Sequence, residues 1–180
     1  MMQTNGYTTV AGWVAAAFLA LSLLAVGPAK AQELEGFWDD PFKDLQADVE
    51  AAREEGKAGV FVFFEMDDCP FCHRMKTQVF TDSEVQEYIK ENLVTVSIDI
   101  EGDVVMSDPE GNELKEKDFA FKQYRVRATP VMIFFDTQGE PAVRYTGPTH
   151  TPEEFLQLME FFVSGAYSEP GMNFFKYKKQ

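Results

Sequence analysis

The chain has 180 residues, of which 45% are hydrophobic and 14% aromatic, which is enough apolar material for one packed domain. Its 16 basic and 30 acidic residues give a formal charge of −14, so nucleic-acid binding and acidic substrates are disfavoured. The 26% of charged residues, 12 glycines and 9 prolines exclude a disordered chain and a fibrous repeat. The two cysteines lie three positions apart, which excludes a scaffold of several disulfides.

The first 31 residues have the features of an export signal. Residues 1–29 carry no charged side chain, and Val10 to Val26 form an apolar run that Gly27-Pro28 ends. Ala29-Lys30-Ala31 then supplies the small residues that a signal peptidase requires, so we expect cleavage after Ala31 and a periplasmic mature protein. An uncleaved membrane anchor is the alternative, because no basic residue precedes the run and its length approaches that of a membrane-spanning helix.

Hydrophobic spacing predicts a helix and a strand ahead of the cysteines. The helix covers residues 40–55, with Asp39 or Asp40 as its N-cap. The strand covers residues 59–65 (GVFVFFE), and its continuous apolar run indicates burial on both faces of a sheet. Cys69 then begins a second helix, because Pro70 suits a first helical turn and apolar residues recur after it at helical spacing.

The rest of the chain alternates helices and strands. In order, the same signals predict a helix from the capping box Thr81-Asp82-Ser83-Glu84, a strand over 93–100, a short hairpin inserted within 101–114, a helix over 115–124, an antiparallel pair of strands over 131–136 and 142–145, and a helix from the capping box Thr151-Pro152-Glu153-Glu154. We therefore expect an α/β fold, in which helices flank a central mixed sheet.

The pair Cys69-Pro70-Phe71-Cys72 is the centre of the predicted chemistry. Two thiols at this spacing on a helix N-terminus can form a small disulfide ring, and the helix dipole favours the thiolate of the first cysteine. Cys69 is therefore the candidate nucleophile. Cys72 is expected to be more buried and to resolve a mixed disulfide by attacking Cys69.

Charged neighbours of the pair act on the thiolate in opposite directions. Asp67 and Asp68 disfavour it, whereas His73 and Arg74 favour it, so the net direction stays open. Lys76 is also basic, but nearly two helical turns separate it from Cys69. We therefore interpret Lys76 as a solvated residue of the helix start.

Three alternatives compete with redox chemistry. A purely structural disulfide would contribute little stability, because a loop of three residues removes little entropy from the unfolded chain. Cys69-x-x-Cys72-His73 is also the attachment pattern of c-type haem, although a haem pocket needs no apolar strand before the first cysteine. A zinc site is disfavoured, because His150 is the only other histidine in the sequence.

These residues together resemble the thioredoxin family, over about residues 59–165. The strand FVFFE, the C-x-x-C pair, Thr129-Pro130 before VMIFFD, and Gly147 before the last helix carry the similarity. The resemblance implies the thioredoxin fold and a thiol:disulfide oxidoreductase that reduces protein disulfides without a cofactor. It also implies a cis Thr129-Pro130 bond that faces the cysteines, with substrate contacts from Pro70, Phe71, Thr129 and Pro130.

The signal, the hairpin and the run RVRATPVMIFFD are most similar to exported bacterial thioredoxin-like proteins of the SoxW type, found with periplasmic sulfur oxidation. We expect a monomer, and since a reductase in an oxidising compartment must be recharged, we also expect a membrane thiol carrier that supplies its electrons. Two positions depart from the family: Asp68 replaces a tryptophan, and Phe63 replaces an acidic residue. Glu65 lies on the same strand face as Phe63, so it is either the proton acceptor for Cys72 or a carboxylate in water.

The expected organisation has four segments: a signal peptide over 1–31, an N-terminal helical extension over 32–58, a thioredoxin-like domain over 59–165 and a tail over 166–180. The tail ends NFFKYKKQ, and three lysines are fewer than a lipid-binding cluster contains. We expect its aromatic residues to pack on the domain rather than on a membrane. A binding module of the same fold with an inert disulfide remains the alternative function.

Overall fold

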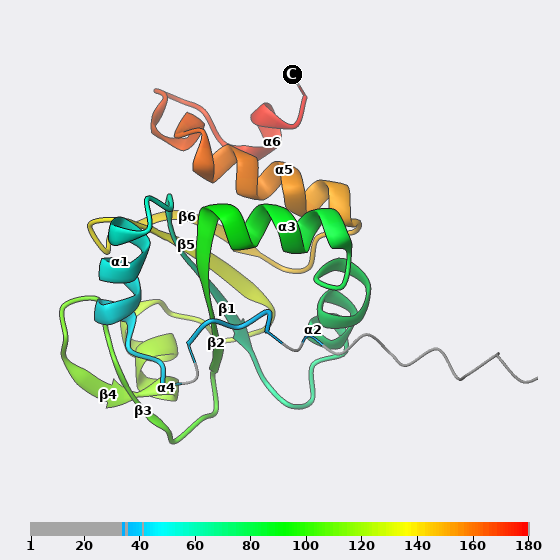
Figure 1. Cartoon of the computed structure of the whole chain (residues 1–180). Helices are drawn as coiled ribbons and strands as arrows, with labels where there is room; N and C mark the ends of the chain where they lie inside the picture. The colour runs from blue at the N-terminus through cyan, green and yellow to red at the C-terminus, as the bar shows by residue number, and fades with distance from the viewer. Residues whose placement is uncertain (1–33, 35, 41, 180) are drawn as a thin grey trace, which may run out of the picture. The chain divides into compact units, whose positions relative to one another are not determined.

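The computed structural model describes residues 34, 36–40 and 42–179 (Figure 1). The predicted signal peptide lies outside the described residues. The elements are, in chain order, α1 (Leu45–Glu54), β1 (Gly59–Glu65), α2 (Pro70–Arg74), the π-helical turn η1 (Met75–Val79), α3 (Ser83–Asn92), β2 (Leu93–Asp99), β3 (Val105–Ser107), β4 (Glu113–Lys115), α4 (Glu116–Asp118), the π-helical turn η2 (Phe119–Gln123), β5 (Val131–Asp136), β6 (Pro141–Thr146), α5 (Pro152–Val163), the 3-10 turn η3 (Ala166–Ser168) and α6 (Phe174–Tyr177). None of these helices is long and apolar enough to cross a membrane.

A four-stranded sheet in the order β2-β1-β5-β6 organises the fold. β1 is parallel to β2, with Glu65 beside Asp99, and antiparallel to β5, with Phe64 beside Val131. β5 and β6 are antiparallel, and β3 and β4 form a separate hairpin. The sheet is therefore mixed, and the predicted α/β fold with an inserted hairpin is confirmed.

Both faces of the sheet are covered by apolar side chains. Phe61 and Phe63 of β1 pack on the face that carries α2, α3 and α5, whereas Val62 and Phe64 pack on the face of α1 and η2. Each of these four side chains is fully buried. Figure 1 shows α3 and α5 side by side, with α6 against α5. The continuous apolar sequence of β1 follows from this burial on both sides.

The residues before α1 cover the outer edge of β2. The ring of Phe37 stacks on Phe80, with ring centroids 4.8 Å apart, and Trp38 stacks on Phe63. The Asp39 N–H donates to Thr95 O at 3.0 Å, and the Asp39 carboxylate accepts the Thr95 N–H at 2.9 Å. At Thr95 these contacts occupy the hydrogen-bonding edge that β2 would otherwise present to other chains.

The predicted N-cap and start of the first helix are wrong. Asp44 caps α1, since its side chain accepts the Ala47 N–H at 3.2 Å. Asp40 accepts the N–H groups of Phe42 and Asp44 at 2.6 Å each, so it stabilises the turn before the helix. Aspartate is common both as an N-cap and in turns, so the residue type alone does not show which aspartate caps the helix.

Two of the later helices differ in detail from the predictions, and a third begins as predicted. Asp82, rather than Thr81, caps α3 by accepting the N–H of Val85 at 3.2 Å, while the Thr81 hydroxyl donates to a carbonyl one turn earlier. The helix predicted over 115–124 divides into α4 and η2. Thr151 caps α5 as predicted, because its hydroxyl oxygen accepts the Glu154 N–H at 3.2 Å.

The tail packs on the rest of the described chain through its aromatic residues, as predicted. Phe174 is buried, and its ring centroid lies 5.6 Å from that of Tyr145 and 6.0 Å from that of Phe161. Lys178, just after α6, pairs with Glu154 of α5. The tail therefore joins the same apolar core as α5.

Candidate functional site

The two cysteines lie at the start of the helix formed by α2 and η1. Cys69 is the N-cap and Cys72 lies in the first turn, so the predicted placement of Cys69 at a helix N-terminus is confirmed. The residues are joined by a disulfide, with Cα atoms 5.2 Å apart. The Cys72 N–H donates to Cys69 Sγ at 3.0 Å. When the disulfide opens, this N–H and the helix dipole stabilise negative charge on Cys69.

The cysteines differ in their access to solvent. Cys69 is 5% exposed and Cys72 1%, which agrees with the expectation that Cys72 is the more buried residue. Pro70 and Phe71 between them are exposed, and Phe71 presents 56% of its surface to solvent. Cys69 is therefore the more accessible of the two cysteines, and an exposed aromatic ring lies two residues after it.

A polar pocket of about 220 Å³ opens beside the disulfide. It is lined by residues from the ends of β1 and β2, from the cysteine helix and from the N-terminal segment, namely Lys43, Glu65, Met66, Asp67, Cys69, Cys72, His73, Lys76, Ser97 and Asp99. Glu65 and Asp99 are neighbours at the carboxyl ends of the parallel strands β1 and β2. This edge is where open sheets place their binding sites.

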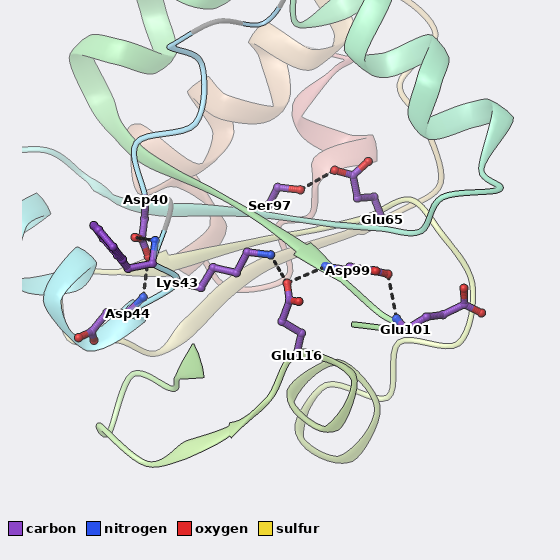
Figure 2. Close-up of polar contacts among 9 residues, drawn as sticks. Asp40, Lys43, Asp44, Glu65, Ser97, Asp99, Glu101 and Glu116 are labelled. Carbon is purple, nitrogen blue, oxygen red and sulfur yellow. Dashed lines mark hydrogen bonds and ion pairs between the residues drawn. The ribbon is translucent and has the colours of Figure 1, made fainter. Parts of the chain in front are cut away.

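Glu65 lines this pocket together with both cysteines. Its carboxylate accepts a hydrogen bond from Ser97 Oγ at 2.6 Å, which Figure 2 shows, and pairs with Lys76 through its other oxygen. The Glu65 side chain is only 16% exposed. The structure therefore favours an engaged carboxylate beside the cysteines over a free carboxylate in water.

The expectation for Lys76 is wrong. Lys76 pairs with Glu65 and lines the pocket, and its side chain is 34% exposed. The prediction used the spacing between Lys76 and Cys69, whereas the spacing between Lys76 and Cys72 determines whether Lys76 faces the pocket. Lys76 lies four residues after Cys72, which places both side chains on one face of the helix.

Lys43, which also lines the pocket, forms a second ion pair with Glu116 (Figure 2). Glu116 is almost fully buried and also accepts the Asp99 N–H at 3.1 Å. These partners offset the cost of burying the carboxylate. The pair could not be predicted from the sequence, because its members lie 73 positions apart. The turn that Asp40 stabilises brings Lys43 into place.

Thr129 and Pro130 lie at the same edge of the sheet as the cysteine loop. The peptide bond between them is cis, and Pro130 is buried. β5 begins at Val131 opposite Phe64, so the bend before β5 meets the end of β1. Pro130 O accepts the Gly147 N–H at 2.9 Å. The Thr129 hydroxyl is buried and has no hydrogen-bond partner among the described residues.

The charged neighbours of the pair take different positions. Asp67, Asp68 and His73 are exposed. Arg74 is half-buried, and its Nη2 donates to the backbone oxygen of Thr149 at 2.6 Å. The guanidinium is therefore engaged on the segment before α5, a contact that the sequence did not predict.

The family model of a thioredoxin-like domain matches residues 45–163, from the start of α1 to the end of α5. The chain belongs to the thioredoxin-like domain family. The match begins before residue 59, where the resemblance seen in the sequence starts, because α1 packs on the same sheet. Family membership and the bond between the two sulfurs disfavour the haem alternative, in which each sulfur would be bonded to a porphyrin.

Solved structures share this thioredoxin-like fold. A thioredoxin-fold protein from Helicobacter pylori is 20% identical, with a TM-score of 0.62 over 83% of this chain and 89% of that one. A DsbH oxidoreductase is 20% identical, with a TM-score of 0.53 over 79% and 92%. A putative disulphide-isomerase from Bacteroides thetaiotaomicron is 26% identical, with a TM-score of 0.52 over 67% and 88%. No curated protein matches the chain significantly.

Proposed function

We propose that this protein is an exported thiol:disulfide oxidoreductase that reduces disulfides in other proteins through Cys69 and Cys72. The observation that carries the proposal is the disulfide at the N-terminus of α2, where the Cys72 N–H donates to Cys69 Sγ. Membership of the thioredoxin-like family supports it. A disulfide that closes so small a loop stabilises a fold little, which favours a chemical role.

The proposed reaction is a pair of disulfide exchanges. The Cys69 thiolate attacks a sulfur of the substrate disulfide, forms a mixed disulfide and displaces the other substrate sulfur as a thiolate. The Cys72 thiol loses its proton and attacks Cys69 Sγ, which releases the second substrate thiolate and closes the Cys69–Cys72 disulfide. Two electrons pass to the substrate, and no cofactor takes part.

Glu65 is the proposed proton acceptor for Cys72. Both residues line the same pocket, whose volume of about 220 Å³ has room for water between them. Ser97 and Lys76 hold the carboxylate in place from the side of the sheet and from the helix. A proton can therefore move from Cys72 to Glu65 through water in the pocket.

The proposed docking surface for a protein substrate consists of Pro70, Phe71, Thr129 and Pro130. Phe71 offers an exposed apolar ring beside Cys69, and the bend at Thr129 and Pro130 lies at the same edge of the sheet. An extended peptide that carries a disulfide would lie across this edge and contact backbone groups of the bend.

The proposed compartment is the periplasm, in which the mature protein acts as a monomer of the SoxW type. The apolar run and the Ala29-Lys30-Ala31 motif support export. A reductase in an oxidising compartment needs a supply of electrons, so we propose a membrane thiol carrier as the partner that reduces the Cys69–Cys72 disulfide.

Reduction of insulin disulfides tests the proposal. The reduced protein should cleave them, and Cys69→Ser should abolish the reaction. Cys72→Ser should still attack, and it should accumulate a mixed disulfide with insulin that mass spectrometry detects. An inactive wild-type protein, or attack that survives Cys69→Ser but not Cys72→Ser, would contradict the proposal. The first result would favour a binding module with an inert disulfide.

A further inference from the structure

The segment Gly147–Thr151, which joins β6 to α5, contacts both flanks of the redox site. On one side, Arg74 Nη2 donates to Thr149 O at 2.6 Å, and the Thr149 hydroxyl donates to Met75 Sδ at 3.5 Å. On the other side, the Gly147 N–H donates to Pro130 O at 2.9 Å. Five residues thus connect the middle of the cysteine helix to the bend before β5.

The conformation of this segment is closely constrained. Thr149 is fully buried, and Gly147 has a φ of +96°, a value that favours glycine. The Thr151 hydroxyl fixes the far end of the segment by capping α5. A displacement at Thr149 therefore disturbs the contacts of Arg74 and of Gly147 together.

The tail is linked to the same segment through Glu154 of α5. Glu154 accepts the His150 N–H at 2.7 Å through one carboxylate oxygen and pairs with Lys178 through the other. Burial alone would raise the pKa of Glu154, but the hydrogen bonds from Lys178 and His150 outweigh it and lower that pKa. Packing of Phe174 in the core places Lys178 beside Glu154, with Nζ 5.5 Å from the Phe174 ring centroid.

We infer that Gly147–Thr151 is a positioning segment, which Arg74 holds directly and Lys178 holds through Glu154, so that the cysteine helix and the Pro130 bend keep a fixed spacing. Its catalytic consequence rests on the proposed function, in which a substrate disulfide lies across Phe71 and the bend. Loosening the segment weakens substrate capture and leaves the intrinsic reactivity of Cys69 unchanged, because the Cys72 N–H on Cys69 Sγ stays in place. Arg74 then acts through the contact with Thr149 rather than through its charge on Cys69.

Replacing Lys178 tests the link to the tail without touching the redox site. In Lys178→Met, amide hydrogen exchange of Gly147 and His150 should quicken about tenfold. The KM for insulin should rise about threefold with little change in kcat, as expected for a loss of substrate binding. Lys178→Arg should behave as wild type. Lys179→Met is the matched control, because Lys179 is exposed and neighbours Lys178.

A second variant separates positioning from electrostatics. Arg74→Met should raise the KM in the same way, while the pH profile of Cys69 alkylation stays that of the wild type. A profile moved to higher pH would show that Arg74 acts by its charge and would overturn its assignment.

The outcomes for Lys178→Met decide the inference separately from the proposed function. Wild-type exchange at Gly147 and His150 would overturn it whatever the activity. Faster exchange with an unchanged KM would overturn the positioning role. If the wild-type protein fails to reduce insulin, the proposed function falls, and the exchange rates alone decide whether the tail holds the segment.

Discussion

Acidic side chains in the pocket beside the disulfide, and next to that pocket, are engaged to different degrees. Glu65 is bound by Ser97 and Lys76, and Glu116 is bound by Lys43 and by the backbone of Asp99. Asp67 and Asp68 are exposed and lie directly before Cys69. Their charge opposes the thiolate, whereas the Cys72 N–H supports it. The reactivity of Cys69 therefore depends on these two opposed local effects.

Replacing Glu65 tests its proposed role as proton acceptor. Glu65→Gln keeps the size of the side chain but removes its basicity, so the Cys72 thiol should lose its proton more slowly. We expect closure of the mixed disulfide to slow about tenfold or more at neutral pH, measured by rapid acid quenching and mass spectrometry.

Lys76→Met is the matched control, because it breaks the ion pair and keeps the Glu65 carboxylate. It should slow closure much less than Glu65→Gln does. Equal effects of the two variants would show that the ion pair matters rather than proton acceptance, and Glu65 would lose its assigned role.

Asp48 gives stability a pH dependence. Burial, and after it the charge and hydrogen bond of Asp40, raise the pKa of Asp48 from 3.8 to about 8. The folded protein thus keeps a proton that the unfolded chain loses above about pH 4, so the free energy of unfolding falls as the pH rises from 4 to 8. Asparagine does not titrate, so Asp48→Asn should remove this loss of stability at higher pH. The asparagine amide can still donate a hydrogen bond to Asp40.

Urea denaturation measures the effect of Asp48→Asn. The stability advantage of the variant over the wild type should grow by about 3 kcal/mol as the pH rises from 5 to 8, since one pKa unit corresponds to about 1.4 kcal/mol. A gain that stays constant across this range would contradict a raised pKa at Asp48.

Elements that depend on local sequence could be predicted. The central strand was predicted from the apolar run of β1, the cysteine helix from Pro70 after Cys69, and the hairpin from the turn at Asp108-Pro109. Burial and turn formation each require particular residue types at adjacent positions, so a local pattern reveals them. Contacts between segments that are distant in the sequence have no local pattern and could not be predicted. The pairs Lys43 with Glu116 and Arg74 with Thr149 depend on how the chain returns on itself.

Gly59 is the residue that lets β1 lie close to β5. A Cβ there would lie 1.9 Å from the backbone oxygen of Phe135, which cannot move without breaking the sheet. Gly59→Ala should therefore destabilise the fold by about 3 kcal/mol or more, measured by urea denaturation.

Gly56→Ala is the control, since it also changes a glycine of positive φ but its Cβ would meet no atom within 4 Å. It should cost about 1–2 kcal/mol from the backbone conformation alone. Equal losses for the two variants would contradict the steric explanation at Gly59.

The four-stranded sheet and the layers on its two faces include residues from both ends of the described chain, so the extension and the tail belong to the folded unit. Phe37 before α1 and Phe174 near the C-terminus both join the core on the face of the cysteines. Residues 1–31 lie outside the described part, and their role as a signal stays a prediction.

Export predicts a defined mature N-terminus. In a bacterial host that exports proteins, N-terminal sequencing or intact mass should show a protein that begins at Gln32 in the periplasmic fraction. An intact Met1 in the membrane fraction would favour the uncleaved anchor.

The reduction potential of Cys69 and Cys72 decides whether the two residues form a reversible redox pair. The purified protein is equilibrated in glutathione and dithiothreitol buffers, and its free thiols are alkylated and counted by mass. Asp67 and Asp68 destabilise the thiolate, and no histidine lies between the cysteines. We therefore expect one two-electron transition between about −270 and −120 mV, nearer the former. A pair that no buffer reduces would contradict a reversible redox role, and a potential near −120 mV would contradict the proposed reductase direction.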